Sequence, residues 1–401
     1  MENESNPSQN SDHDDSISEE EYNIWKQNTP FLYHTMLSHS LPSPSITVQW
    51  MPPTSAKPTI LYGTNASNYD TNFLYLAEVD LPDITKNNKL DGAIQPETSS
   101  ALKLTNIITI PHNGEINKAR CCPQNASIIA SKTISGEINL YDTANLKSGK
   151  KLIGHKKEGF GLSWSQVKAG YLASSAKDNL ICIWDTYAST INDRIDPLIV
   201  LDGHHAIVGD VCFHKKQSDI LASVDDNKRV FLWDLRKGSK PISIAQDHHG
   251  EIYCVDFNPL DENLYATGSE DKSIMIWDMR KMNNHLASLE YHSDNINALQ
   301  WSPKNVSILA SCGNDKKVCI WDISQLGAEM SKEDYEDGPA ELLFVHAGHI
   351  ARINDLCWKQ DSEYMICSTS EDNILQIWQM ASEIYRNECL TPKHIKCDII
   401  E

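Results

Sequence analysis

Serine or threonine, histidine and aspartate recur together along this chain, and these are the residue types that hydrolases combine for nucleophilic catalysis. The recurrence has a fixed register: a hydroxyl residue, a polar residue and an aromatic residue follow each histidine at offsets of 19, 23 and 29. The histidines are His112, His155, His204, His248, His292 and His349; the hydroxyl residues are Ser131, Ser174, Ser223, Thr267, Ser311 and Ser368; the polar residues are Ser135, Asp178, Asn227, Asp271, Asp315 and Asp372; the aromatic residues are Tyr141, Trp184, Trp233, Trp277, Trp321 and Trp378. An enzyme needs one nucleophile, whereas this constellation repeats. We therefore interpret it as architecture, in which buried polar side chains hydrogen-bond to one another.

The elements that position these residues are short apolar runs bounded by polar turn residues, for example 180–183, 230–232 and 274–276. Runs of this kind predict buried strands. The Gly-His and Trp-Asp dipeptides of the units resemble the WD repeat, which implies four-stranded blades around a central channel. Six units cover about residues 111–385, and strand-like runs between 45 and 110 can supply one more blade. The predicted fold class is all-β: a seven-bladed WD-repeat β-propeller with an N-terminal α-helix packed on its side.

Charge and cysteine content restrict the partners and the compartment. The 401 residues carry a net charge of −20, of which residues 1–21 contribute −8 and residues 329–341 contribute −5. Such a chain is unsuited to direct binding of DNA and suits a strongly basic partner. Eleven cysteines without CxxC spacing indicate free thiols in a reducing compartment and no zinc site. The acidic N-terminus is unlike a signal peptide, and no apolar run is long enough to cross a membrane. We expect no metal, no cofactor and no membrane association.

The N-terminal region predicts a helix outside the repeats. Ser18 and Glu21 form a capping-box pattern, and Pro30 predicts a kink or a second helix start. The predicted organisation is a disordered acidic tail at 1–16, the helix at 17–41, the propeller at 45–388 with an acidic insertion at 322–348, and a C-terminal tail at 389–401. Residues 1–16 and 389–401 carry no recognisable motif.

The acidic insertion lengthens the connection between Trp321 and His349 to 28 residues, where the other connections have 14 to 20. An acidic segment followed by an apolar one suits a basic amphipathic helix as partner. A solvated loop is the alternative that composition leaves open.

Four segments resemble a narrower group, the retinoblastoma-binding, histone-binding WD-repeat family: residues 20–33, 157–164, 333–346 and 370–380. The resemblance implies a non-catalytic subunit that binds the histone H3–H4 dimer and works with catalytic or scaffold subunits. The family's assemblies carry out chromatin assembly, histone acetylation, deacetylation, remodelling and Polycomb methylation. The implied location is the nucleus, and also the cytoplasm.

The resemblance also implies two binding sites. The first helix of histone H4 would lie in a groove between the N-terminal helix and the insertion, with acidic residues as one wall and apolar residues as the floor. The wall is Asp334, Glu336 and Asp337, and the floor is Phe31, Leu32, Met36, Phe344 and Val345. The second site, for the histone H3 tail, would be the top face, with Glu115, Asn117, Glu158, Phe160 and Glu371. Other positions of that site depart from the family: glutamates are replaced at Pro42, Gly209 and Asn295, an aromatic residue at Asn297 and a histidine at Asn65. We expect the top face to bind the H3 tail weakly, or another peptide.

Two other functional classes remain as alternatives. Trp-Asp-x-Arg occurs at 233–236 and 277–280, which resembles the motif of substrate receptors for cullin ubiquitin ligases, with Arg236 and Arg280 as adaptor contacts. A propeller hydrolase would need a unique catalytic cluster, and the sequence offers none.

Overall fold

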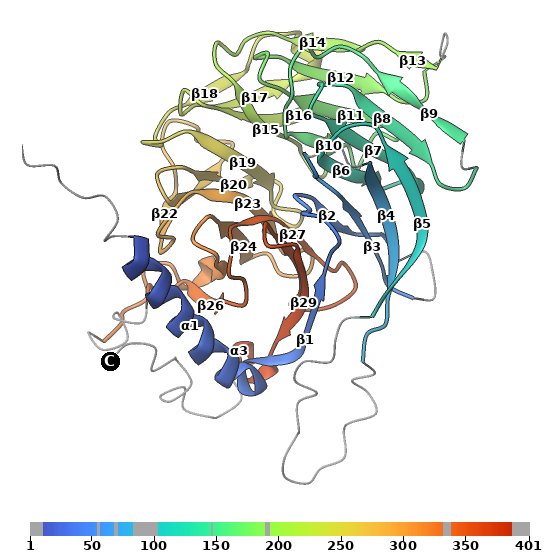
Figure 1. The fold of residues 1–401 in the computed structure, drawn as a ribbon. Coiled ribbons are helices and arrows are strands. Elements are labelled where there is room, and N and C mark those ends of the chain that lie inside the picture. Colours follow the sequence, from blue (N-terminus) through green and yellow to red (C-terminus); the bar gives the residue numbers. More distant parts are fainter. Residues whose placement is uncertain are drawn as a thin grey trace, which may run out of the picture.

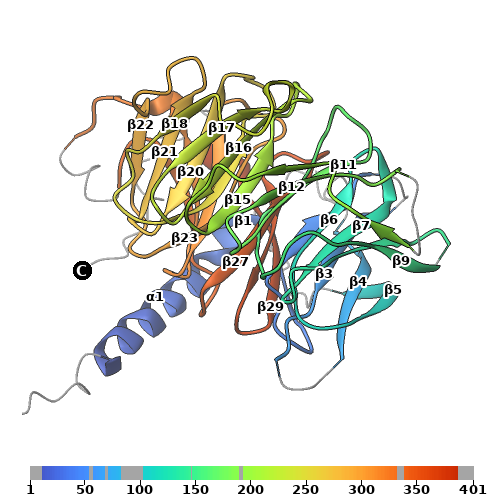
Figure 2. The same ribbon diagram turned by 90° about the horizontal axis from the view of Figure 1, so that it is seen from above.

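Seven antiparallel sheets surround a central channel in the computed structural model, like the blades of a propeller (Figures 1 and 2). The structure describes residues 11–53, 57–67, 71–82, 103–145, 147–188, 193–331 and 338–386, with the backbone alone at 11–21 and 147–148. The predicted seven-bladed WD-repeat propeller with one N-terminal helix is confirmed. None of the helices in these ranges is long and apolar enough to cross a membrane.

The blades follow one another along the chain, each running from an inner strand at the channel to an outer strand at the rim. Blade 1 consists of β2 (Val48–Trp50), β3 (Thr59–Gly63), β4 (Asn72–Val79) and β5 (Leu104–His112). Blade 2 consists of β6 (Ile116–Cys122), β7 (Asn125–Thr133), β8 (Ile138–Asp142) and β9 (Lys147–Leu152). Blade 3 consists of β10 (Leu162–Trp164), β11 (Tyr171–Ser175), β12 (Ile181–Asp185) and β14 (Ile199–Leu201). Blade 4 consists of β15 (Val208–Phe213), β16 (Ile220–Asp225), β17 (Val230–Asp234) and β18 (Ser243–Ala245).

The remaining blades have the same order. Blade 5 consists of β19 (Ile252–Phe257), β20 (Leu264–Ser269), β21 (Ser273–Asp278) and β22 (Ala287–Glu290). Blade 6 consists of β23 (Ile296–Trp301), β24 (Ile308–Gly313), β25 (Val318–Asp322) and β26 (Leu342–His346). Blade 7 consists of β27 (Ile353–Trp358), β28 (Met365–Ser370), β29 (Ile374–Met380) and β1 (Tyr33–Ser40). Short helical elements are η2 (Leu235–Lys237), η3 (Ile323–Gln325) and α3 (Ser382–Tyr385), and β13 (Arg194–Ile195) adds a parallel fifth strand to blade 2.

The N-terminal segment closes the ring, which corrects the predicted boundary between helix and propeller. The helix was expected to extend to residue 41, but Tyr33–Ser40 forms β1 and pairs antiparallel with β29. Tyr33, Thr35 and Leu37 are buried while the residues between them are more exposed, which is the two-residue period of a strand. The last blade therefore takes its outer strand from the start of the chain, so the propeller begins near residue 33.

Helix α1 (Ser11–Leu32) is longer at its start than predicted. Residues 11–16 belong to it, so the expected tail at 1–16 is partly helical, and Ser18 lies inside the helix instead of capping it. Pro30 lies in the last turn of one continuous helix, and no second helix begins there. The absent N–H of proline is tolerated there because the strand follows two residues later.

Side chains near the ends of the inner strands bind the backbone of the next blade. Gln300 accepts a hydrogen bond from the backbone N of Trp358 at 2.8 Å, and Asp256 accepts one from Trp301 at 3.0 Å. Gln49 does the same for the backbone N of Cys121 at 2.8 Å. These bonds join neighbouring sheets at the channel, where backbone donors would otherwise stay unpaired.

The recurring polar residues form the predicted architectural networks. In blade 3, the Ser174 hydroxyl bonds His155 Nε2 at 2.8 Å and accepts from Trp184 Nε1 at 2.9 Å. The same arrangement recurs in blades 4 to 7. In blade 4 the expected Asn227 is bypassed, because Asp225 binds the Nδ1 of His204 at 2.9 Å instead. Burial in these networks lowers the pKa of His349 to about 3, which keeps its imidazole neutral.

Candidate functional site

A chain of hydrogen bonds fixes helix α1 to blades 6 and 7. Trp25 Nε1 donates to the Tyr33 hydroxyl at 2.8 Å, and that hydroxyl lies 2.7 Å from His346 Nδ1. His346 Nε2 lies 2.8 Å from Gln376 Oε1, and Gln376 Nε2 donates to the Gly348 carbonyl at 2.7 Å. Because the Gln376 oxygen must accept, His346 carries its proton on Nε2 and accepts the Tyr33 hydroxyl on Nδ1. Burial lowers the pKa of His346 well below its usual value, in agreement with a neutral ring.

Aromatic rings pack around this chain. The His346 ring stacks on Trp378 with centroids 4.4 Å apart, and Trp25 meets His346 edge-on at 5.8 Å. Tyr33 contacts Phe344 edge-on at 5.5 Å. Gly348 leaves room for the helix, since a Cβ there would lie 2.7 Å from the Trp25 ring. The helix is therefore held rigidly beside β26, the strand that directly follows the acidic insertion (Figure 1).

The structure brings together most of the residues predicted as the groove floor. Leu32 and Phe344 are buried in one cluster with Trp25 and Tyr33, and Met36 is partly buried against it. Phe31 differs, because its side chain is 72% exposed at the end of α1. A large aromatic side chain left in water beside a fixed helix is suited to contact a partner.

Val345 does not share the floor, which corrects that assignment. It packs against the cluster between blades 5 and 6, with Trp321 and Leu289, and not against α1. The physical reason is strand geometry, since neighbouring residues on β26 point to opposite faces and Phe344 takes the face toward the helix. Leu343 is partly buried on the α1 side.

The predicted acidic wall, Asp334, Glu336 and Asp337, lies outside the described residues. The flanks of the insertion are described. The chain leaves blade 6 through η3 and returns at Gly338, where an added Cβ would lie 3.4 Å from the Tyr291 ring and 2.9 Å from Leu342. It then enters β26, whose Phe344 packs against Tyr33.

The predicted top-face residues also lie together. Glu115, Asn117, Glu158, Phe160 and Glu371 all line the central channel, a cavity of about 880 Å³. Two of the carboxylates are paired within the chain: Lys177 binds Glu158 at 2.6 Å, and Arg352 binds Glu371. These pairs reduce the negative charge that the rim can offer to a ligand.

The uncharged substitutions lie in the same cavity. Asn65, Gly209, Asn295 and Asn297 line it, whereas Pro42 is not among its lining residues. Asn297 Nδ2 donates to Asn314 Oδ1 and to the Ile353 carbonyl, both at 2.8 Å. Its amide therefore serves the blade 6–7 contact.

The structure adds a group of residues that our sequence reasoning missed. Asp226, Glu251 and Tyr253 line the cavity on blades 4 and 5, and the Tyr253 hydroxyl donates to Glu251 at 3.1 Å. Burial and the neighbouring Glu251 raise the pKa of Asp226 to about 6. The repeat register could have identified two of them, because Glu251 and Tyr253 stand three and five residues after His248, as Glu115 and Asn117 stand after His112.

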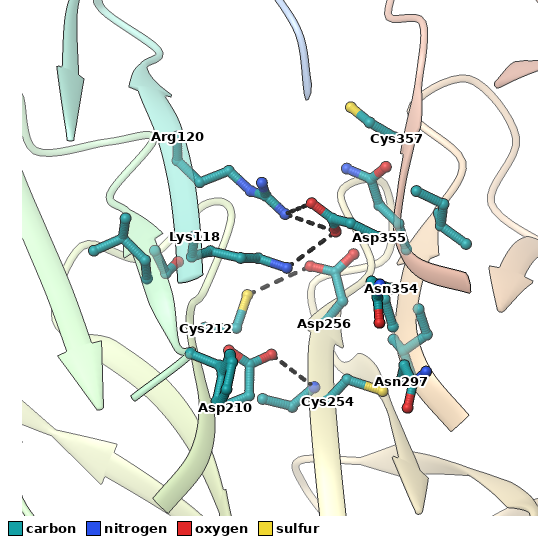
Figure 3. Close-up of a pocket in the computed structure, with 18 of the residues that line it drawn as sticks. Lys118, Arg120, Asp210, Cys212, Cys254, Asp256, Asn297, Asn354, Asp355 and Cys357 are labelled. Carbon is teal, nitrogen blue, oxygen red and sulfur yellow. Dashed lines mark hydrogen bonds and ion pairs between the residues drawn. The ribbon is translucent and has the colours of Figure 1, made fainter. Parts of the chain in front are cut away.

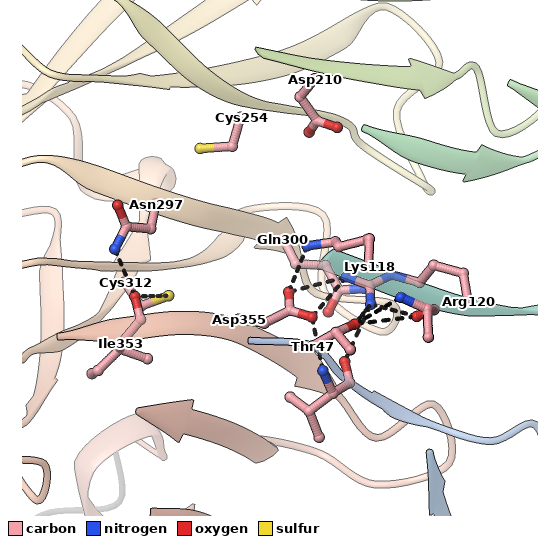
Figure 4. Close-up of polar contacts among 12 residues, drawn as sticks. Thr47, Lys118, Arg120, Asp210, Cys254, Asn297, Gln300, Cys312, Ile353 and Asp355 are labelled. Atoms are coloured by element: carbon pink, nitrogen blue, oxygen red, sulfur yellow. Dashed lines mark hydrogen bonds and ion pairs between the residues drawn. The ribbon is translucent and has the colours of Figure 1, made fainter. Parts of the chain in front are cut away.

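Deeper in the channel, one carboxylate joins three blades (Figures 3 and 4). Asp355 on blade 7 binds Lys118 Nζ and Arg120 Nη2 on blade 2, each at 3.0 Å. It also accepts the backbone N of Val48 on blade 1 at 2.9 Å. Burial disfavours the Asp355 charge, but Arg120 and Lys118 hold its pKa below the usual range. Asp210 lacks such a cation contact, and burial raises its pKa to about 6.

The two arginines of the Trp-Asp-x-Arg motifs are exposed and held by the preceding aspartates. Arg236 binds Asp234 through Nε at 2.8 Å and Nη2 at 2.9 Å. Arg280 binds Asp278 in the same two-pronged way. Each guanidinium is fixed in direction, with its other N–H groups available to a partner. Among the described residues, no group of three or more His, Cys, Asp or Glu side chains could hold a metal ion.

Known proteins resemble this chain over nearly its whole length. The family of the histone-binding protein RBBP4, which is also a component of the CAF1 complex, matches residues 20–83, which include most of α1's described side chains, β1 and the first three strands of blade 1. The WD domain, G-beta repeat, matches residues 195–234, 239–278, 283–322 and 340–379. The WD-40 repeat-containing protein MSI3 of Arabidopsis thaliana is 39% identical over 390 residues, which cover 92% of this chain and 91% of that protein.

Proposed function

The chain belongs to the WD-repeat family of RBBP4-like histone-binding proteins, and from this premise we propose that it is a non-catalytic subunit that binds histones H3 and H4. It would serve as a histone escort and scaffold in chromatin assembly, acetyltransferase, deacetylase, remodelling or Polycomb complexes. This role places it in the nucleus, and in the cytoplasm where new histones are made, without direct contact to DNA or membranes.

We propose that the first helix of histone H4 lies along α1, between that helix and the acidic insertion. The observation that carries this proposal is the rigid placement of α1 against β26, with Phe31 exposed at the helix end. Leu32, Met36 and Phe344 would support the floor, and Asp334, Glu336 and Asp337 would bind lysine and arginine side chains of the ligand. A basic amphipathic helix fits an acidic wall beside an apolar contact.

Size-exclusion chromatography with the purified H3–H4 complex tests this proposal. The wild type should co-elute with H3–H4, and Asp334→Ala/Asp337→Ala should not. The matched control is Asp193→Ala/Asp196→Ala, which removes two carboxylates on either side of β13 and should leave co-elution unchanged. Full co-elution of the Asp334→Ala/Asp337→Ala variant would sink the groove assignment.

For the top face we propose weak binding of the H3 tail, or binding of a different peptide. Glu158 and Glu371 are engaged in ion pairs, and Gly209 and Asn295 offer no charge. Calorimetric titration with an H3 tail peptide should give an affinity weaker than low micromolar. A low-micromolar affinity would contradict this proposal.

A second candidate function is substrate reception for a cullin ubiquitin ligase, which the fixed and exposed Arg236 and Arg280 favour. Arg280→Ala should then abolish binding to the ligase adaptor while H3–H4 still co-elutes. Unchanged adaptor binding would remove this candidate.

A further inference from the structure

The outer strands of blades 3 and 4 expose pairs of apolar side chains. Leu198 and Val200 at β14 are 53% and 40% exposed, and Ile242 and Ile244 at β18 are 43% and 52% exposed. Residues two apart on an extended segment point to the same face. Each pair therefore forms a small apolar strip at the rim of the propeller, where Figure 1 shows β14 and β18.

These strips lie on free sheet edges. Among the described strands, β14 pairs with β12 alone and β18 pairs with β17 alone. A free edge presents backbone N–H and C=O groups that can pair with another extended chain. Proteins commonly protect such edges with charged side chains, whereas here the edge residues at 242 and 244 are isoleucines.

Blade 2 shows that the rim of this propeller accepts an added strand. The segment after β12 returns to blade 2, where β13 pairs in parallel with the outer strand β9. Lys151 N donates to the Asp193 carbonyl at 2.8 Å, and Ile153 N donates to the Ile195 carbonyl at 3.1 Å. Within the described residues, neither blade 3 nor blade 4 has an equivalent of β13.

The approach to the blade 4 edge is basic, in contrast to the whole chain. Arg236, Lys237 and Lys240 are exposed between β17 and β18, and the sequence from 235 to 246 contains no acidic residue. The chain as a whole has a net charge of −20. A basic strip on an acidic protein attracts an acidic partner and repels a basic one, so histones fit this surface poorly.

We propose that Lys237, Lys240, Ile242, Ile244 and the free edge of β18 form a docking surface for an extended protein segment in which apolar and acidic residues alternate. Such a segment would add a strand to β18, with its apolar side chains on the two isoleucines and its carboxylates near the two lysines. The inference does not depend on histone binding. A second copy of this chain fits less well because two basic edges repel each other, and DNA would leave the isoleucines without a contact.

The test uses a fluorescent twelve-residue peptide of alternating valine and glutamate, with binding to the full chain measured by anisotropy at low salt. Ile242→Ser/Ile244→Ser should weaken binding at least about tenfold, and Lys237→Glu/Lys240→Glu should do the same. The matched control is Ile107→Ser, which changes a 49%-exposed isoleucine on the outer strand of blade 1 and should leave affinity unchanged. Arg280→Ala should also leave it unchanged, which separates this surface from a ligase-adaptor contact.

Several results would overturn the proposal. One is the absence of binding by the wild type at millimolar peptide, and another is equal affinity of the Ile242→Ser/Ile244→Ser variant. A third is binding of a DNA duplex that depends on Lys237 and Lys240 but not on the isoleucines. A fourth is a dimer in sedimentation velocity that the isoleucine variant abolishes, because the edge would then serve self-association. Circular dichroism melts identical to the wild type exclude misfolding of these surface variants.

Discussion

The Tyr33 hydroxyl is the link between helix α1 and the propeller, and Tyr33→Phe removes that link alone. The hydroxyl accepts from Trp25 Nε1 at 2.8 Å and meets His346 Nδ1 at 2.7 Å. Both partners are buried, since Trp25 is 5% and His346 0% exposed. In the variant each would keep its polar atom inside the protein without a partner.

The size of the effect follows from those two orphaned groups. A buried donor or acceptor that loses its partner costs about 1–3 kcal/mol, so Tyr33→Phe should destabilise the protein by about 2–4 kcal/mol. The ring contacts of residue 33 with Phe344 and Trp378 remain, so packing contributes little to the change. The loss should appear first as opening of α1, because the broken bonds connect that helix to blade 6.

Urea denaturation followed by tryptophan fluorescence measures the change in the free energy of unfolding, and hydrogen exchange locates it. We expect faster exchange of α1 amides in the variant. The matched control is Tyr75→Phe, because the Tyr75 ring stacks on Tyr62 while its hydroxyl makes no hydrogen bond among the described residues. The control should change stability by less than about 0.5 kcal/mol. A similarly small change for Tyr33→Phe, with α1 exchange unaltered, would refute the reasoning.

Three further predictions concern stability, each measured by urea denaturation. Gly348→Ala should destabilise by about 1–3 kcal/mol through overpacking, because the new Cβ would lie 2.7 Å from the Trp25 ring; an unchanged midpoint would show that the helix has room to move. Asp355→Asn should cost about 3 kcal/mol or more, because Lys118 and Arg120 would lose their buried partner; Asp80→Asn, which breaks an exposed pair with Lys57, should have little effect, and equal effects would contradict the buried-pair argument. Acidification from pH 6.5 to 5 should destabilise the protein, because burial depresses the folded pKa of His346 and His349 below the unfolded value near 6.5. Their contribution is complete above the unfolded pKa and is lost at about 1.4 kcal/mol per pH unit for each histidine below it; His292, whose pKa is raised to about 10, is protonated in both states there and adds no change. Stability that is flat over this window would contradict the neutral assignment of both rings.

The sequence predicts the propeller well because each blade repeats the same buried polar network at fixed spacing. Residues such as Ser174 and Trp184 can satisfy each other only in one register, so the spacing carries the fold. The closure by β1 was missed because Tyr33–Ser40 follows a helix signal and matches no repeat. Its alternation of buried Tyr33, Thr35 and Leu37 was visible in the sequence as a two-residue period, but Pro30 drew the interpretation toward a second helix start.

The candidate site was predicted in part for similar physical reasons. Leu32 and Phe344 are apolar residues next to a helix and a strand, so their burial follows from pattern. Val345 was misplaced because a bulge lies between Ile320 and Trp321, and the side on which β26 residues face depends on that register shift. The hydrogen bond between Tyr33 and His346 joins residues 313 positions apart, and no local pattern reports such a contact.

The most direct test of the central claim is calorimetric titration of the full chain with a synthetic peptide of the first helix of histone H4. The groove assignment predicts binding by the wild type, at least about tenfold weaker binding by Phe31→Ala, and no measurable binding by Asp334→Ala/Asp337→Ala. Ile107→Ala, an exposed isoleucine far from α1 in the sequence, should bind as the wild type does. Wild-type affinity in both the Phe31→Ala and the Asp334→Ala/Asp337→Ala variants would contradict the claim that α1 and the acidic insertion form the histone-binding groove.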